Sequence, residues 1–225
     1  MKYAHAYTLL LVFVSHTSCG QSQTNSPTGK TKSETKNIAS SPGSNETYHT
    51  QYEHIDSIGK RLVIQNSFPR GGDKYTDPNG KVWVFAVFWS RIFNETDNPL
   101  ELKIDFPVDS FKLPSSPGRY FKLFLPADTM TLEKEGLYNY GLPVLNSFLN
   151  KGLQKASSLK RTINPKESIA FYFVTLFNIG VDGFLRTELS LKGQNLSYTL
   201  NGKEIHCGSI NLKNLTLTNK HTTGN

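Results

Sequence analysis

The sequence predicts a mainly β protein with the architecture of an antiparallel β-sandwich, and three observations support this prediction. Phe, Tyr and β-branched residues are concentrated in short segments, with 14 Phe and 10 Tyr in a chain of 225 residues. Pro and Gly turn signals separate these segments at fairly regular spacing, which favours a sandwich over a parallel sheet. Residues 131–152 alone break the pattern, so we expect a short helical insertion in a β domain.

The strongest strand signal lies at residues 81–93, where β-branched and aromatic residues run almost uninterrupted. Side chains alternate between the two faces of a strand, and here both faces are apolar. We therefore expect a central strand, with Trp83 and Trp89 in the core rather than on a sugar-binding surface. Arg91 shares their face, which places its charge at the open end of the strand or near the core beside a carboxylate.

Further strands are expected on both sides of this segment. They cover residues 60–65, 100–106, 119–125, 169–177, 184–191, 196–200 and 204–207. The polar turn at 94–99 is expected to join 81–93 and 100–106 as two antiparallel strands. Asn201-Gly202 supplies the positive φ angles of a tight hairpin. The Pro-Arg-Gly-Gly stretch at 69–72 is interpreted as a turn.

The helical insertion is expected to contain one or two short helices. Thr131 can cap the first of them, and Pro143 can begin the second. Gly152 suits the end of the second helix. Its apolar side is formed by Val144, Leu145, Phe148 and Leu149, and we interpret this stripe as core.

The N-terminus has the three zones of an export signal. Lys2 supplies a positive start, residues 6–14 an apolar centre, and small residues precede Cys19. The apolar centre is shorter than the roughly 20 residues that a membrane-spanning helix needs. Residues 1–18 are therefore predicted to be a signal peptide rather than a permanent anchor.

The stretch Thr17-Ser18-Cys19-Gly20 resembles a lipobox, the motif at which lipoprotein signal peptidase cuts. The resemblance implies cleavage between Ser18 and Cys19 and lipidation of Cys19 with fatty acyl chains such as palmitate. His16 departs from the motif, which usually has an apolar residue there. Cleavage by ordinary signal peptidase after Gly20 is the alternative, and it gives a soluble secreted protein.

The remaining chain divides by composition. Residues 19–49 are rich in Ser, Thr, Asn, Gln, Gly and Lys and are expected to form a disordered tether behind the lipidated cysteine. Residues 50–217 are expected to form the sandwich domain, and 218–225 a disordered tail. The domain is large enough to bury a core without disulfides.

Two segments of the domain are similar to immunoglobulin-like sandwich modules of exported bacterial proteins. They are Asn94-Glu-Thr-Asp-Asn-Pro-Leu-Glu-Leu102 and Ile163-Asn-Pro-Lys-Glu-Ser168, in which Lys166 replaces the usual Gly. The whole chain resembles lipoproteins of the Bacteroidota type. This resemblance implies an immunoglobulin-like fold and an address at the cell envelope, on the periplasmic face of the outer membrane.

The sequence assigns no catalytic, cofactor-binding or metal-binding residue. It has no HExxH, CxxC or GxSxG motif. His206 and Cys207 are adjacent in an expected strand and therefore point to opposite faces, which does not suit a metal pair. Cys207 is expected to be a small buried thiol. An enzyme remains open but is the less favoured class, because triads assemble in space rather than in sequence.

Charge limits the range of partners. The formal net charge is +7, but the basic residues are scattered, and no nucleic-acid partner is expected. We expect a lipid-anchored envelope protein that acts as a binding or structural module, with the membrane and an envelope protein or glycan as partners. The alternative is an envelope hydrolase, or a protease inhibitor that presents a loop at 109–119. The sequence leaves the oligomeric state open.

Overall fold

The protein is described by a computed structural model that covers residues 48–114, 116–212 and 218–223. The expected signal peptide, the lipidation site at Cys19 and all but the end of the tether lie outside the described residues. The strands are β1 (Thr50–Ile55), β2 (Arg61–Asn66), β3 (Arg70–Thr76), β4 (Val82–Asn94), β5 (Leu100–Phe106), β6 (Phe111–Lys112), β7 (Tyr120–Phe124), β8 (Ser157–Ile163), β9 (Ser168–Phe177), β10 (Thr187–Lys192), β11 (Asn195–Leu200), β12 (Lys203–Asn211) and β13 (Thr218–Thr223).

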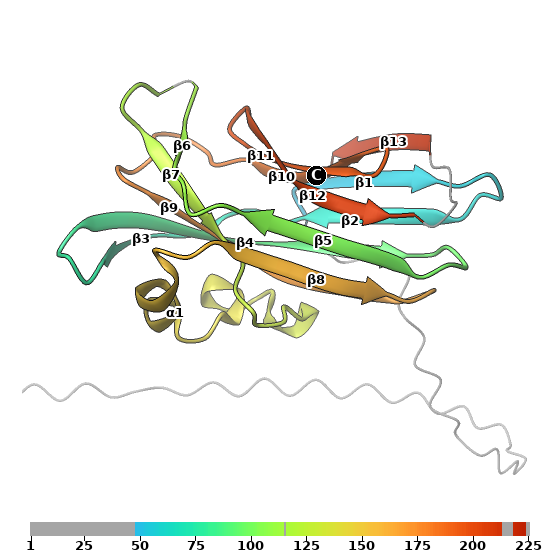
Figure 1. The fold of residues 1–225 in the computed structure, drawn as a ribbon, viewed down its shortest axis with the longest axis horizontal. Coiled ribbons are helices and arrows are strands. Elements are labelled where there is room, and N and C mark those ends of the chain that lie inside the picture. The colour runs from blue at the N-terminus through green and yellow to red at the C-terminus, as the bar shows by residue number, and fades with distance from the viewer. Residues whose placement is uncertain (1–47, 115, 213–217, 224–225) are drawn as a thin grey trace, which may run out of the picture. The chain divides into compact units, whose positions relative to one another are not determined.

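The strands form two antiparallel sheets, so the predicted mainly β class is confirmed (Figure 1). The first sheet has eight strands in the order β13-β1-β2-β4-β9-β7-β6, with β3 also paired to β4. The second has five strands in the order β10-β11-β12-β5-β8. Every strand pair described is antiparallel.

Strand β4 is the centre of the first sheet, and both of its faces are buried, as the sequence predicted. It pairs with β9 over ten residue pairs, from Val84–Phe177 to Phe93–Ser168. Trp83 and Trp89 are 4% and 1% exposed, which places both in the core. The prediction that they are core residues is confirmed.

The two faces of the first sheet belong to separate cores. One face packs against the second sheet through residues such as Phe88, Phe106 and Tyr198. The other face packs against the helical insertion through residues such as Trp89, Leu149 and Tyr172. The molecule therefore has three layers, and Figure 1 shows the helical layer gathered on one side of the strands.

The helical insertion consists of two short 3-10 helices, η1 (Leu132–Lys134) and η2 (Tyr138–Gly141), and of α1 (Leu145–Gly152). The end at Gly152 is confirmed. Three expectations were wrong. Thr131 makes no side-chain capping bond, α1 begins at Leu145 and not at Pro143, and Val144 is 73% exposed with a φ of 43°. Val144 precedes the helix in a left-handed conformation, which turns its side chain away from the apolar stripe.

Three further expectations are corrected by the strand pairing. Strand β4 lies in the first sheet and β5 in the second, so the turn at 94–99 crosses between sheets instead of closing a hairpin. Residues 70–76 form strand β3 and not a turn, because a register shift between Gly71 and Lys74 allows them to pair with β4. Residues 218–223, expected in a tail, form β13, which pairs with β1.

The two turns that cross between the sheets are held together by Asn94. Its backbone N–H donates to the carbonyl of Glu167 at 2.9 Å, and its carbonyl accepts from Lys166 N–H at 2.7 Å. Its side-chain amide donates to the carbonyl oxygens of Asn98 at 2.8 Å and Ile163 at 3.0 Å. The start of β9 is therefore fixed relative to the end of β4.

The segment at 109–119 forms the hairpin of β6 and β7 rather than an isolated loop. Leu113 N–H donates to the carbonyl of Arg119 at 3.1 Å, and Leu113 is buried in the core between the sheets. Figure 1 shows the hairpin end extending beyond the body of the strands. The loop that the inhibitor alternative requires is therefore tied to the domain by a core side chain.

Candidate functional site

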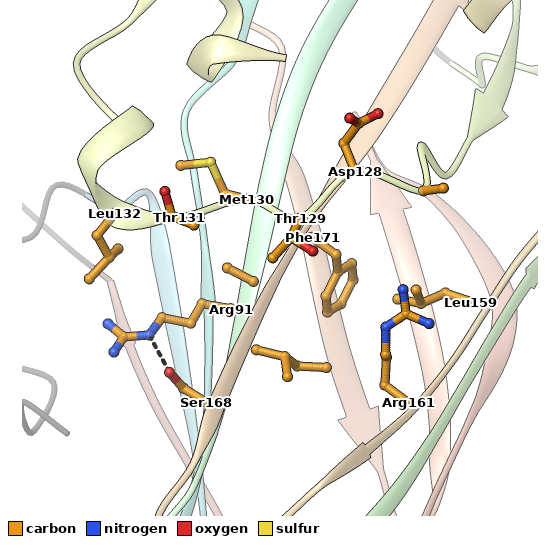
Figure 2. Close-up of a pocket in the computed structure, with 13 residues that line it drawn as sticks. Arg91, Asp128, Thr129, Met130, Thr131, Leu132, Leu159, Arg161, Ser168 and Phe171 are labelled. Atoms are coloured by element: carbon orange, nitrogen blue, oxygen red, sulfur yellow. Dashed lines mark hydrogen bonds between the residues drawn. The ribbon is translucent and has the colours of Figure 1, made fainter. Parts of the chain in front are cut away.

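A groove opens at one edge of the sandwich, where an edge of the first sheet faces an edge of the second (Figure 2). We call it the edge groove. It has a volume of about 330 Å³. Four parts of the chain line it: Arg91 of β4, residues 127–132 between β7 and η1, Leu159 and Arg161 of β8, and residues 168–171 at the start of β9.

The groove exists because the neighbouring chain leaves the first sheet early. Residues 127–131 run beside β9, but their pairing with it consists of one isolated bridge between Thr129 and Phe171. Beyond Met130, whose N–H donates to the carbonyl of Ala170 at 3.3 Å, the chain turns away into η1. The first residues of β9 therefore border an open space on this side.

The opposite wall is the outer edge of the second sheet. Strand β8 pairs with β5 alone among the described strands, so its other edge has no strand partner within the described chain. Leu159 and Arg161 lie on the same face of β8, because side chains two residues apart point the same way. Leu159 is buried in the core, whereas Arg161 is exposed.

Arg91 supplies a second guanidinium. The alternation of side chains along β4 predicted that this residue lies either at the open end of the strand or near the core. It is 6% exposed, and its Nε donates to Ser168 Oγ at 3.3 Å. Its guanidinium carbon lies 6.0 Å from the centre of the Phe93 ring. Because Ser168 opens β9 directly after the turn that Asn94 anchors, the position of the Arg91 side chain depends on the same pair of turns.

The polar and apolar parts of the edge groove are separated. Figure 2 shows Arg91 and Arg161 on opposite sides of the view, with the Phe171 ring between them and Asp128 at the far end. The apolar lining comes from Met130, Leu132, Leu159, Ile169 and Phe171. The charged side chains of the lining are Arg91, Arg161 and Asp128.

The guanidinium groups of the edge groove are suited to binding an acidic group. A guanidinium stays protonated in proteins and presents a planar fork that matches a carboxylate. Ser168 accepts a hydrogen bond from a guanidinium, which cannot act as a base toward its hydroxyl. An exposed guanidinium beside an apolar lining can recognise an acidic group attached to an apolar one.

Cys207 and His206, which the sequence analysis considered, do not line the edge groove. Cys207 is a free, buried thiol, and burial raises its pKa from 9.0 to about 12. His206 is exposed on the opposite face of β12, as the alternation predicted. Within residues 48–114, 116–212 and 218–223 there is no group of three or more His, Cys, Asp or Glu residues able to hold a metal ion.

Sequence reasoning singled out Arg91 and missed the rest of the groove. Arg161 lies in a short polar strand that was not predicted. Residues 127–130 were assigned to neither the expected strand that ends at 125 nor the expected helical insertion that begins at 131. One available signal was the order Leu159, Arg161, Ile163, in which a charge interrupts an otherwise apolar face. Such an inward charge is typical of an edge strand.

No helix in the described part of the chain has the length and apolar character required to cross a membrane. Comparison of the chain with protein-family models, with curated proteins and with solved structures gives no match. The fold and the groove define the class of the molecule at this point: a mainly β protein of two antiparallel sheets with a helical third layer and a basic groove at the sandwich edge.

Proposed function

We propose that this chain is a lipid-anchored protein of the bacterial cell envelope whose sandwich domain binds a short, extended, acidic segment of an envelope partner protein in the edge groove. The observation that carries the binding role is the exposed guanidinium of Arg161 beside an apolar lining at an open sheet edge. The observation that carries the anchor is the lipobox-like stretch that ends at Cys19.

The immunoglobulin-like assignment is part of the same proposal, and the strand order supports it. The order β2-β4-β9-β7 has the neighbour pattern of the A-B-E-D sheet of that fold. Strand β5 follows β4 and crosses to the other sheet, as strand C does after B. Strands β8, β10, β11 and β13 are additions to, or departures from, the basic arrangement.

An acidic peptide fits the groove for three reasons. Its carboxylates match the guanidinium fork of the exposed Arg161. Apolar side chains alternating with them match the lining around Phe171. Finally, the outer edge of β8 can accept the backbone of an extended segment as an added strand.

Fatty-acid labelling tests the anchor. Cells that produce the full chain are fed an alkyne fatty acid. We expect the wild type to be labelled and the Cys19→Ser variant to carry no label. Cys207→Ser is the matched control, because it removes the other cysteine and leaves the motif intact. An unlabelled wild type contradicts the anchor and makes the soluble secreted form the correct reading.

Fluorescence polarisation tests the groove, with the full chain and a labelled peptide in which glutamate and leucine alternate. We expect saturable binding that Arg161→Gln weakens about tenfold, because one charge-assisted contact is lost. Lys160→Gln is the control, since it removes the same charge from the adjacent position on the opposite face of β8. Equal binding of a lysine–leucine peptide, or equal weakening by both substitutions, contradicts the proposal.

A further inference from the structure

A second basic site lies on the face of the first sheet that carries the helical layer, beyond the end of α1. Three lysines line it, Lys81, Lys112 and Lys122, together with the ring of Tyr120, and we call it the lysine pocket. Its volume is about 600 Å³, within the size range of small-ligand sites. We propose that the lysine pocket binds the phosphoryl group of a phosphate monoester carried on a small polar scaffold. This inference is independent of the edge groove and of the lipid anchor.

The sheet register brings the lysines together. Lys112 of β6 lies directly opposite Tyr120 of β7, so their side chains share a face. Lys122 follows Tyr120 by two residues and therefore shares the same face. Lys81 comes from the turn before β4, and its Nζ donates to Tyr120 Oη at 2.7 Å.

The side chains of these lysines form no ion pair in the described structure, although the charge of Lys81 contributes to the lowered pKa of Asp77. Lys81 Nζ lies 4.1 Å from the centre of the Trp83 ring, and Lys122 Nζ donates to the backbone carbonyl of Val108 at 2.9 Å. These partners are neutral. Among the described residues, none of the ion pairs includes any of the three lysines.

The one carboxylate in the lining, Asp77, is already committed to its own turn. Its Oδ1 accepts from the N–H groups of Asn79 and Lys81, both at 2.9 Å. Its Oδ2 accepts from Trp83 Nε1 at 3.1 Å, and that bond is the main reason why the pKa of Asp77 lies below its usual value. Three ammonium groups and one carboxylate leave the pocket with two excess positive charges.

A phosphoryl group suits this arrangement better than a carboxylate does. Lysine acts as a point charge that tolerates many directions of approach, whereas a planar carboxylate is matched best by an arginine fork. The three lysines come from three different segments, and a phosphate monoester offers three oxygens to such a set. Ser110, Asn79 and Gln154 also line the pocket and add neutral hydrogen-bonding groups for a polar scaffold such as a sugar.

Two probes separate the possible sources of the phosphoryl group. The first is glucose 6-phosphate, measured by titration calorimetry against glucose as the uncharged control. The second is a vesicle of phosphatidylcholine with or without phosphatidic acid, measured by co-sedimentation. Both use the full chain with Cys19→Ala, so that a lipid anchor contributes to neither measurement.

We expect at least one phosphorylated probe to bind and its matched control not to bind. Lys112→Gln is expected to weaken that binding about tenfold, because one charged contact to the ligand is lost. The side chain of Lys112 is exposed and makes no described contact within the protein, so the substitution should leave the fold intact. Lys160→Gln on β8 is the equal-charge control and should leave the binding unchanged. Binding of glucose 6-phosphate assigns a free ligand, and binding of the phosphatidic acid vesicles alone assigns a lipid headgroup.

The inference is overturned if neither phosphorylated probe binds saturably. It is also overturned if Lys160→Gln weakens binding as much as Lys112→Gln does, because general charge attraction then accounts for the result. Failure here leaves the fatty-acid labelling and the peptide titration unaffected, so the two proposals fail separately.

Discussion

The side-chain amide of Asn66 in β2 exchanges two hydrogen bonds with the backbone of Leu189 in β10, across the two sheets. Asn66 Oδ1 accepts from Leu189 N–H at 2.9 Å, and Asn66 Nδ2 donates to the Leu189 carbonyl at 3.2 Å. The same amide oxygen accepts from Ser90 Oγ at 2.7 Å. The amide thus imitates one rung of strand pairing between β2 of the first sheet and β10 of the second.

Replacing Asn66 with Ala should lower the free energy of unfolding by about 2 to 4 kcal/mol, because the buried backbone groups of Leu189 lose their partners. Urea unfolding followed by tryptophan fluorescence measures the change. Asn195→Ala is the control, since Asn195 is an exposed residue of β11. A loss equal to that of the control contradicts the bridging role of the Asn66 amide.

Asn94→Ala should be comparably destabilising, by about 2 to 4 kcal/mol, because the Asn94 amide holds both crossing turns. Besides its donated bonds, Asn94 Oδ1 accepts from Thr96 N–H at 3.0 Å and from Thr96 Oγ1 at 2.6 Å. Asn98→Ala is the matched control, because Asn98 takes part through its backbone carbonyl. Equal unfolding midpoints for the two variants contradict this prediction.

Gly208→Ala tests the close approach of β12 to β5. A Cβ at this position lies 2.0 Å from the carbonyl oxygen of Lys103, and the φ of Gly208 is +152°. The backbone must shift to admit a methyl group, so we expect a loss of about 3 kcal/mol or more, or failure to fold. Gly136→Ala has open space around it and should change the unfolding midpoint little.

The thiol of Cys207 should resist alkylation in the folded protein, because it is 3% exposed and its pKa is raised to about 12. The Cys19→Ala variant isolates this thiol. We expect mass spectrometry to find no iodoacetamide adduct at neutral pH in buffer and one adduct in urea. Rapid labelling in buffer contradicts the burial of Cys207.

The free energy of unfolding should fall as the pH rises above about 9. Desolvation raises the pKa of Cys207 and of Tyr172 to about 12, and it raises the pKa of Tyr198 as well. The unfolded chain therefore releases these protons at a lower pH than the folded chain does. In the interval between the two pKa values of each group, the loss is about 1.4 kcal/mol per pH unit.

Urea midpoints measured from pH 8 to pH 11 test this slope, where the range is set by the ordinary pKa values of roughly 8.5 for Cys and 10 for Tyr. Cys207→Ala should flatten the lower part of the curve and leave the tyrosine part unchanged. A midpoint that stays constant over the whole range contradicts the assignment of buried, protonated groups.

The central strands were predictable because their chemistry is local. In β4 and β9 both faces are apolar, so composition alone identifies them. The hairpin turn was predictable for the same reason, and Asn201 and Gly202 have the expected positive φ angles of 44° and 80°. Strands β1 and β8 were not predicted, because polar residues dominate their sequences. Their extended conformation depends on pairing with neighbouring strands and not on an apolar pattern of their own.

The assignment of strands to sheets depended on tertiary contacts. The residue types between 94 and 99 do not distinguish a hairpin from a crossing turn. The difference lies in the bonds from Asn94 to Ile163, the last residue of β8, and to Asn164, which follows it. The edge groove was partly accessible, because alternation along β4 singled out Arg91. Its opposite wall, with Arg161, was not accessible, since it forms only when β8 is placed in the second sheet.

The pairing of β1 with β13 has a consequence for the order in which the chain can fold. The register joins Thr50 to Thr223 and Ile55 to Thr218, so the strand that leaves the ribosome first within this domain must wait for the strand that leaves last. Contacts so distant in sequence are slow to form. Until β13 has been synthesised, one edge of β1 has no partner strand, and a change in β13 acts directly on the first strand of the domain.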